Sequence, residues 1–150
     1  MRQPDLSPDQ QAQLSDLVAA HRLRACPVDL PKARRFLSQA ADALAELPRI
    51  RASAVRADTA YNAAHDVGEA LLASCGYRTA SSAGHHSAVG AFLAVGLSGT
   101  PAQQAARDFN ILRDARNQLR YQAKPIGVAQ AAFAAATAAT LLDQAQATAM

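Results

Sequence analysis

Residues 49–74 read RIRASAVRADTAYNAAHDVGEALLAS and predict one long helix. Small or apolar residues recur within it at alternating steps of four and three, the spacing of one face of an α-helix. This face consists of Ile50, Ala54, Ala57, Tyr61, Ala64, Gly68, Leu71 and Cys75. Because most of these side chains are small, the backbone of another helix can approach closely. Cys75-Gly76 should end the helix, since glycine is common just after the last helical residue.

The segments on either side also carry helix signals. Ser7-Pro8-Asp9-Gln10 and Thr100-Pro101-Ala102-Gln103 both place Ser or Thr before Pro, with Gln three positions after the cap. This capping-box arrangement predicts helices that begin at about residues 8 and 101. A further helix should run from Asp29 to Leu47, because the residue before Pro48 avoids the helical region.

The remaining segments complete an all-helical pattern. Residues 77–84 are polar and should form a loop, and a short helix is expected from about His85 to Leu97. The helix from residue 101 should reach about 123, followed by an Ala-rich helix over 129–147. No alternating strand pattern competes. The sequence therefore predicts an all-α fold, an up-and-down helical bundle of five to six helices.

Length and composition suit one domain over residues 1–150, with a core over about 30–147 and an N-terminal helix over about 8–22. Half of the residues are apolar but only 5% are aromatic, so Ala, Leu and Val must build the core. The net charge of +3 permits an acidic partner without requiring one.

The cysteines and the first residues bear on the compartment. Cys26 and Cys75 lack the spacing of a metal or redox motif and are expected to be reduced thiols. The start, MRQPDLSPDQ, lacks the apolar stretch of a signal peptide, and no segment approaches the roughly 20 apolar residues that cross a bilayer. We therefore expect a cytoplasmic protein without membrane contact.

An arginine interrupts the apolar face of the helix that begins near residue 101. That face consists of Ala105, Phe109, Leu112, Arg116, Leu119 and Ala123. Arg113, Arg116 and Arg120 also share one side of the helix, where like charges repel by a few tenths of a kcal/mol per pair. Some group outside this helix should compensate the three arginines.

Two interpretations of the arginines are open. A polar stripe on the long helix, beside its apolar face, could supply an ion-pair layer; its members are Asp58, Asn62, His65 and Glu69. Alternatively, the arginines form an anion pocket with Asn117 and Tyr121, because guanidinium groups match phosphate oxygens and a buried unpaired arginine is costly.

The histidines also allow more than one interpretation. His85 and His86 begin a helix, where neutral imidazoles could exchange a proton or simply cap and solvate the first turn. His65, beside Asp66, is either a satisfied polar residue or a general base. Adjacent histidines on a helix point about 100° apart, and no carboxylate or third histidine accompanies them at recognisable spacing. Neither a metal nor a cofactor is therefore expected.

Three segments resemble the HEPN superfamily of small helical-bundle proteins, in order along the chain. They are AYNAAHD (60–66), GYRT (76–79) leading to GHH (84–86), and RDARNQLRY (113–121). The resemblance spans roughly residues 50 to 142 and is closest to a bacterial branch of uncharacterised members.

The resemblance carries a motif of Arg, a polar residue, and His five positions after the Arg. Arg116 matches the arginine and Asn117 the polar residue, but Tyr121 occupies the histidine position. A tyrosine, with a reference pKa near 10, is a poor base at pH 7. Active toxins paired with nucleotidyltransferase antitoxins often have a second Tyr two residues further on, where this chain has Ala123.

The resemblance implies a homodimer that acts on RNA, as a metal-independent endoribonuclease or the toxin of a toxin–antitoxin module. Arg116, Asn117 and Tyr121 would then be catalytic, with Arg116 stabilising the charge that develops as a 2′-hydroxyl attacks the adjacent phosphate. Arg113, Arg120, His65, His85 and His86 would bind RNA or supply protons. The alternative is a non-catalytic module that binds a nucleotide, RNA or a nucleotidyltransferase partner.

Overall fold

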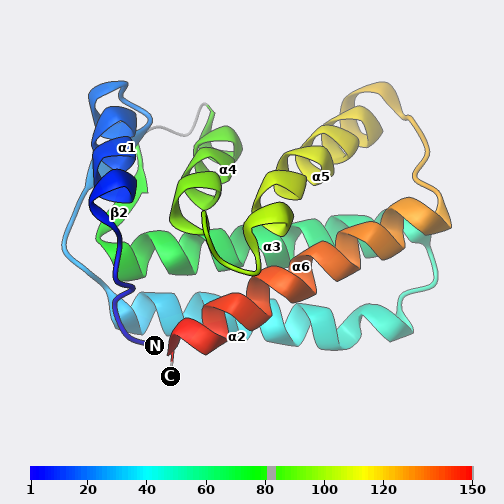
Figure 1. The fold of residues 1–150 in the computed structure, drawn as a ribbon. Helices are drawn as coiled ribbons and strands as arrows, with labels where there is room; N and C mark the ends of the chain where they lie inside the picture. Colours follow the sequence, from blue (N-terminus) through cyan, green and yellow to red (C-terminus); the bar gives the residue numbers. More distant parts are fainter. Residues whose placement is uncertain (81–83, 150) are drawn as a thin grey trace.

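The computed structural model describes residues 1–80 and 84–149, which form six α-helices and two short strands. The helices are α1 (Pro8–Ala19), α2 (Leu30–Glu46), α3 (Ser53–Cys75), α4 (His85–Gly96), α5 (Gln103–Gln122) and α6 (Val128–Ala149). α2, α3 and α6 lie alongside one another, and α1, α4 and α5 cover one side of this layer at steep angles (Figure 1). The predicted all-α class and the bundle of five to six helices are confirmed.

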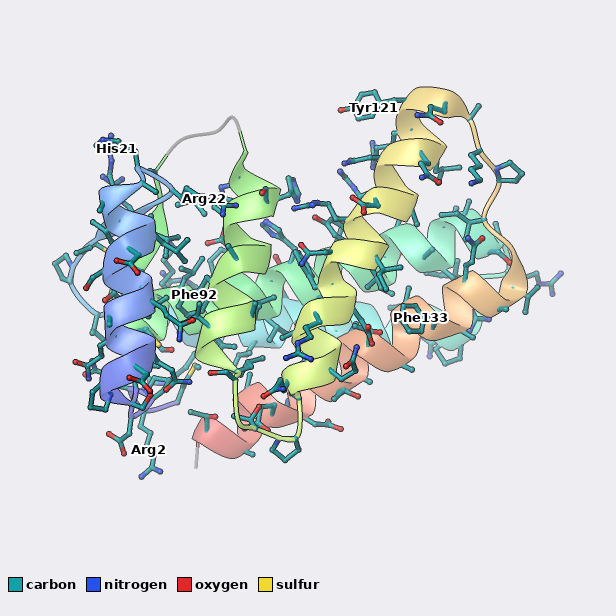
Figure 2. The ribbon with its side chains drawn as sticks, turned by 45° about the horizontal axis from the view of Figure 1, so that its top comes forward. Arg2, His21, Arg22, Phe92, Tyr121 and Phe133 are labelled. Carbon is teal, nitrogen blue, oxygen red and sulfur yellow. The ribbon has the colours of Figure 1, made fainter. Side chains whose placement is uncertain are left out.

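Two three-residue strands were not expected from the sequence. β1 (Leu23–Ala25) pairs antiparallel with β2 (Tyr77–Thr79), with Leu23 opposite Thr79. The loop predicted over 77–84 is therefore wrong at residues 77–79, which form β2. Strands this short lack room for an alternating pattern that the sequence could show. Residues 81–83 lie outside the described part. Arg22, just before β1, donates from Nη2 to Ser87 Oγ of α4 at 2.8 Å and lies between α1 and α4 (Figure 2). Arg22 therefore connects the residue before β1 to the first turn of α4.

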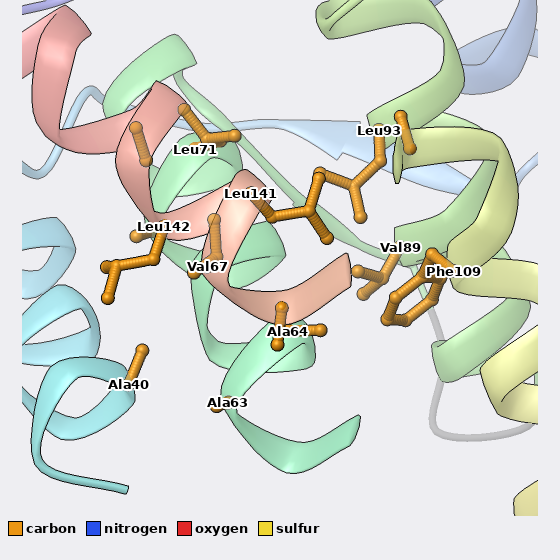
Figure 3. Packing of buried hydrophobic residues seen from close by; sticks show 14 of the residues in the cluster. Ala40, Ala63, Ala64, Val67, Leu71, Val89, Leu93, Phe109, Leu141 and Leu142 are labelled. Carbon is orange, nitrogen blue, oxygen red and sulfur yellow. The ribbon is translucent and has the colours of Figure 1, made fainter. Parts of the chain in front are cut away.

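α3 is the central helix and is buried on most of its circumference. Ala63, Ala64, Val67 and Leu71 belong to one buried cluster with Leu141 and Leu142 of α6 and Val89 and Leu93 of α4 (Figure 3). At Gly68 a Cβ atom would lie 2.4 Å from Val89 Cγ1, so α4 approaches the α3 backbone where only glycine fits without a shift. The close approach predicted along the small-residue face is found here.

The predicted helix ends vary in accuracy. The capping box at Ser7 is present, but the one at Thr100 is wrong, because α5 begins at Gln103. Thr100 Oγ1 instead donates to Leu97 O at 2.7 Å, and Gln103 Oε1 accepts from Gly99 N–H at 2.7 Å. The long helix starts at Ser53 rather than Arg49, since residues 47–49 form a 3₁₀ turn.

The cysteines are both free, and burial raises the pKa of the Cys75 thiol to about 11. Within residues 1–80 and 84–149, every helix is too short or too polar to span a bilayer.

Candidate functional site

The arginines of α5 face the polar stripe of α3. Arg116 Nε lies 3.4 Å from Asp58 Oδ1, and Arg120 Nη2 donates to both Asp58 carboxylate oxygens at 3.2 and 3.3 Å. Arg113 lies 3.7 Å from the exposed Asp114, its neighbour in the chain. The predicted ion-pair layer is therefore present at Asp58, with one carboxylate between two guanidinium groups.

Arg116 also stacks on an aromatic ring. Its guanidinium carbon lies 5.2 Å from the centre of the Tyr61 ring, which is itself stacked on Phe109 at 5.3 Å. This cation–π arrangement explains how an arginine occupies the apolar face of α5. The buried Arg116 Nε has no hydrogen-bond partner among residues 1–80 and 84–149, although Asp58 Oδ1 lies 3.4 Å away as its ion-pair partner. A donor of this kind is suited to an additional acceptor.

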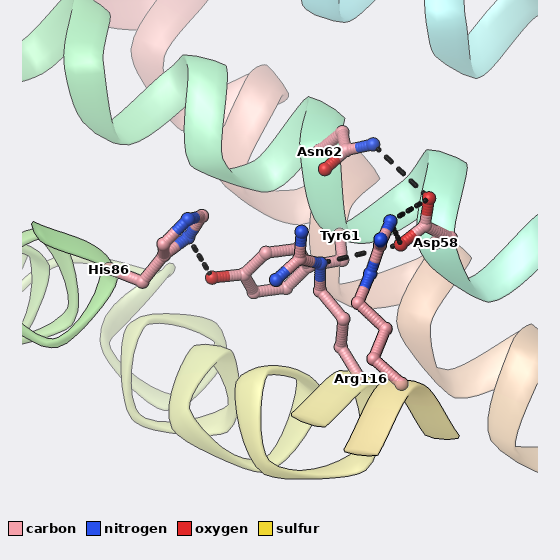
Figure 4. Close-up of polar contacts among 6 residues, drawn as sticks. Asp58, Tyr61, Asn62, His86 and Arg116 are labelled. Atoms are coloured by element: carbon pink, nitrogen blue, oxygen red, sulfur yellow. Dashed lines mark hydrogen bonds and ion pairs between the residues drawn. The ribbon is translucent and has the colours of Figure 1, made fainter. Parts of the chain in front are cut away.

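Tyr61 connects the arginines to the first turn of α4. Its hydroxyl lies 2.6 Å from His86 Nδ1, and the two rings are stacked at 5.6 Å (Figure 4). Burial raises the pKa of Tyr61 to about 12, although Arg116 and Arg113 oppose the shift. The phenol therefore stays protonated at neutral pH. When its oxygen accepts the Nδ1–H of His86, the Nε2 atom carries the lone pair that a general base requires.

Three histidines form one cluster beside Tyr61. The ring of His65 lies 4.5 Å from that of His86 and 5.0 Å from that of His85. Burial lowers the pKa of His65 to about 3, with further lowering by the other two histidines and by Arg116. Burial and Arg116 also lower the pKa of His86. His65 and His86 are therefore neutral at pH 7, the form that accepts a proton or binds a metal ion.

A carboxylate joins two of these histidines. Glu69 Oε1 lies 2.7 Å from His85 Nε2 and 3.9 Å from His65 Nε2. Within the described part of the chain, Glu69 pairs with histidines rather than arginines, so the ion-pair layer predicted there is wrong. The expectation that no carboxylate or third histidine accompanies the histidine pair is also wrong, because one ligand atom from each of His65, Glu69 and His85 falls within 4.8 Å of the others.

The three motif residues of α5, Arg116, Asn117 and Tyr121, do not lie on the same side of the helix. Asn117 is exposed and Tyr121 is 82% exposed at the far end of the helix (Figure 2). Five helical residues turn a side chain by about 140°, which directs Tyr121 away from the side that Arg116 occupies. Among the predicted site residues, the structure thus brings Arg113, Arg116, Arg120, His65, His85 and His86 together on α3, α4 and α5, without Asn117 and Tyr121.

Four participants were not identified as site residues from the sequence: Asp58, Tyr61, Glu69 and Thr79. Tyr61 was assigned to the apolar face of α3, and Asp58 and Glu69 to its polar stripe. Thr79 was assigned to a loop, yet its Oγ1 lies 2.6 Å from His85 Nδ1. The i, i+4 spacing of His65 and Glu69 was the available signal, since it places both side chains on one side of a helix.

A small apolar hollow adjoins the arginines where α5 meets α3 and α6. It has a volume of about 60 Å³, and its lining includes Ile111, Leu119, Ile126, Phe133 and the stem of Arg116. Ile111 is 55% exposed and Phe133 40%. Apolar side chains this open beside charged ones are typical of a contact surface.

No family model, curated protein or solved structure matches this chain. The resemblance to the HEPN superfamily therefore rests on the three sequence segments alone.

Proposed function

We propose that the protein is a HEPN-like homodimer that binds RNA through the arginine–histidine face, and that it cleaves RNA without a metal ion. This face consists of Arg113, Arg116, Arg120, Tyr61, His65 and His86. The observation that carries the proposal is the placement of Arg116, whose guanidinium carbon lies 5.2 Å from the centre of the ring of Tyr61, the residue in contact with His86. A fixed cation and a neutral histidine thus occupy neighbouring positions.

The expected chemistry follows from these two groups. His86 Nε2 takes the proton of a ribose 2′-hydroxyl, whose oxygen attacks the adjacent phosphorus. Arg116 stabilises the negative charge that develops on the phosphate oxygens. As the bond to the 5′-oxygen breaks, His86 returns the proton to that oxygen. The products are a 2′,3′-cyclic phosphate and a 5′-hydroxyl end, so no co-reactant is needed.

Dimerisation is supported by the apolar hollow beside Arg116. Ile111 and Phe133 are exposed next to this arginine, so a second copy that covers them would bring two arginine–histidine faces together. The resemblance implies the same pairing. The free cysteines are compatible with the reducing cytoplasm that we propose as the compartment.

The test is cleavage of single-stranded RNA by the purified protein in the presence of a chelator. Arg116→Ala and His86→Ala should each lower the rate by roughly 100-fold or more, the usual cost of removing an oxyanion donor or a general base. Arg107→Ala is the matched control, because Arg107 is an exposed arginine of the same helix. If the wild type cleaves no faster than Arg116→Ala, the nuclease proposal is rejected.

A second candidate, a non-catalytic module that binds a nucleotide, RNA or a nucleotidyltransferase, is favoured by one observation. Tyr121, at the motif's histidine position, is exposed and directed away from the histidine cluster. This candidate predicts that Arg116→Ala weakens the binding of labelled RNA. It also predicts that neither the wild type nor any variant cleaves the RNA. If the arginines serve only as ion pairs, Arg116→Ala should lower stability and leave RNA binding unchanged.

A further inference from the structure

We propose that His65, Glu69 and His85 bind one Zn²⁺ ion, which links the middle of α3 to the first residue of α4. Two histidines and one glutamate are a donor set that zinc enzymes use, with water in the fourth position. The three residues lie on the side of the histidine cluster away from Arg120. The zinc site shares His65 with the arginine–histidine face, but it contains neither Arg116 nor His86, the two residues that the proposed RNA cleavage uses.

One ligand atom from each of the three residues lies within 4.8 Å of the others, close to the spacing of a zinc site. Zinc bonds of about 2.0–2.2 Å place the ligands of a tetrahedral site roughly 3.3 Å apart. Glu69 Oε1 lies 2.7 Å from His85 Nε2 and 3.9 Å from His65 Nε2, values on either side of that separation. A small rotation of the glutamate would equalise them. His65 and Glu69 are held rigidly relative to each other because both belong to one buried helix.

The ring of His85 is oriented by a contact with its second ring nitrogen, Nδ1. Its Nδ1 lies 2.6 Å from Thr79 Oγ1, and Thr79 is held by the pairing of β2 with β1. Hydrogen bonding of the second ring nitrogen is the usual way in which proteins orient a metal-binding histidine. With Nδ1 engaged, Nε2 is the nitrogen directed toward Glu69. Thr79 is therefore a positioning residue for the site.

His65 supplies an independent observation. Its Nε2 is buried and has no hydrogen-bond partner in the described part of the chain, 1–80 and 84–149. An unsatisfied buried polar atom destabilises the fold, and a metal ion at this position would bind it directly. The side chains of His65 and Glu69 are only 14% and 12% exposed, so water competes poorly for them.

The surrounding charges are compatible with a cation. Glu69 contributes one negative charge, and Asp66 lies one helical turn before it on α3. Arg116 opposes the cation, but its charge is already shared with Asp58 at 3.4 Å. His85 is the most exposed of the three ligands, which leaves the fourth coordination position open toward solvent. Water or a phosphate oxygen could occupy that position.

The experiment measures Zn²⁺ binding by the full chain after chelator treatment, by equilibrium dialysis and calorimetry. The wild type should bind one ion per chain, and zinc should raise its melting temperature. His85→Ala and Glu69→Gln should abolish the tight site, while Thr79→Val should weaken it by roughly 10–100-fold, the usual effect of losing an orienting partner. Four-coordinate Co²⁺ should show its visible absorption band in the wild type, and His85→Ala and Glu69→Gln should lose it.

Two control variants keep the result interpretable. His86→Ala removes the neighbouring histidine, and His21→Ala removes the histidine after α1; both should bind zinc as the wild type does. Circular dichroism of the metal-free variants reports whether each is folded. The proposal is overturned if the wild type binds no zinc, or if folded His85→Ala binds it with unchanged affinity. RNA cleavage in chelator is unaffected by either result, so the two proposals fail separately.

Discussion

Asp66 shows how burial and a neighbouring charge act on a single residue. Burial, and then the nearby Glu69, raise the pKa of its carboxyl group to about 6. The folded state therefore binds a proton more tightly than the unfolded chain does between about pH 4 and 6. The stability that this proton contributes is present below pH 4 and lost as the pH rises through 6. At neutral pH the ionised carboxylate consequently destabilises the fold.

Asp66→Asn should therefore increase the free energy of unfolding at pH 7. We expect a gain of about 1 kcal/mol, smaller than the pKa shift alone implies, because the side chain is partly exposed and solvent screens it. At pH 3 the Asp66 carboxyl is mostly protonated in both the folded and the unfolded state, so the gain should nearly vanish. Urea unfolding in chelator at the two pH values measures the difference, and an equal gain at both would contradict the assignment.

Among the helices, the close crossing of α3 and α4 sets the geometry of the site. At Gly68 a Cβ atom would lie 2.4 Å from the buried Val89, and Glu69 is the next residue. Gly68→Ala should lower the free energy of unfolding by about 1–3 kcal/mol, because overpacking outweighs the gain in helix propensity. Gly96→Ala is the control, since its Cβ would meet Phe92 at 3.4 Å, close to an ordinary contact. Urea unfolding that ranks the two variants equally would refute this view of the crossing.

The helices could be predicted from the sequence because their signals are local. Ser7 caps α1 as expected, and Gly76 ends α3 with a φ of 82°, in the left-handed region where glycine is favoured. The helix cap predicted at Thr100 was wrong because the Thr100 side chain instead belongs to a tight turn, in which it donates to Leu97 O. The strands β1 and β2 were missed because their pairing joins segments about 50 residues apart.

The arginines of the candidate site were predictable because one residue of α5 interrupts the apolar pattern of its own helix. Arg116 stood out because it interrupts an apolar face, and the structure accounts for it through Asp58 and the Tyr61 ring. The zinc-type grouping could not be seen, because His85 reaches Glu69 only through the α3–α4 crossing. Sequence spacing reports neighbours on one helix, whereas contacts between helices depend on the packing angle.

For the molecule as a whole, the apolar hollow is the surface most suited to a second copy. A stable interface buries about 800 Å² per partner, roughly a tenth of the 7803 Å² that the monomer exposes. Ile111 and Phe133 would lie near the centre of such a contact, with Arg116 at its margin. Two arginine–histidine faces brought together would repel each other, so RNA phosphates should stabilise the pair.

Phe133→Asp should therefore weaken dimerisation by roughly 30-fold or more, the effect of losing about 2 kcal/mol at a buried aromatic anchor. Light scattering over a concentration series measures the change, and Val55→Asp is the control because Val55 is exposed on α3 outside the hollow. Single-stranded RNA should shift the wild type toward the dimer, and Arg116→Ala should reduce that shift. If Phe133→Asp and the wild type have the same mass at every concentration, this hollow is not the dimer interface. A functional face would then have to act within one chain, where Arg116 and His86 already meet through Tyr61.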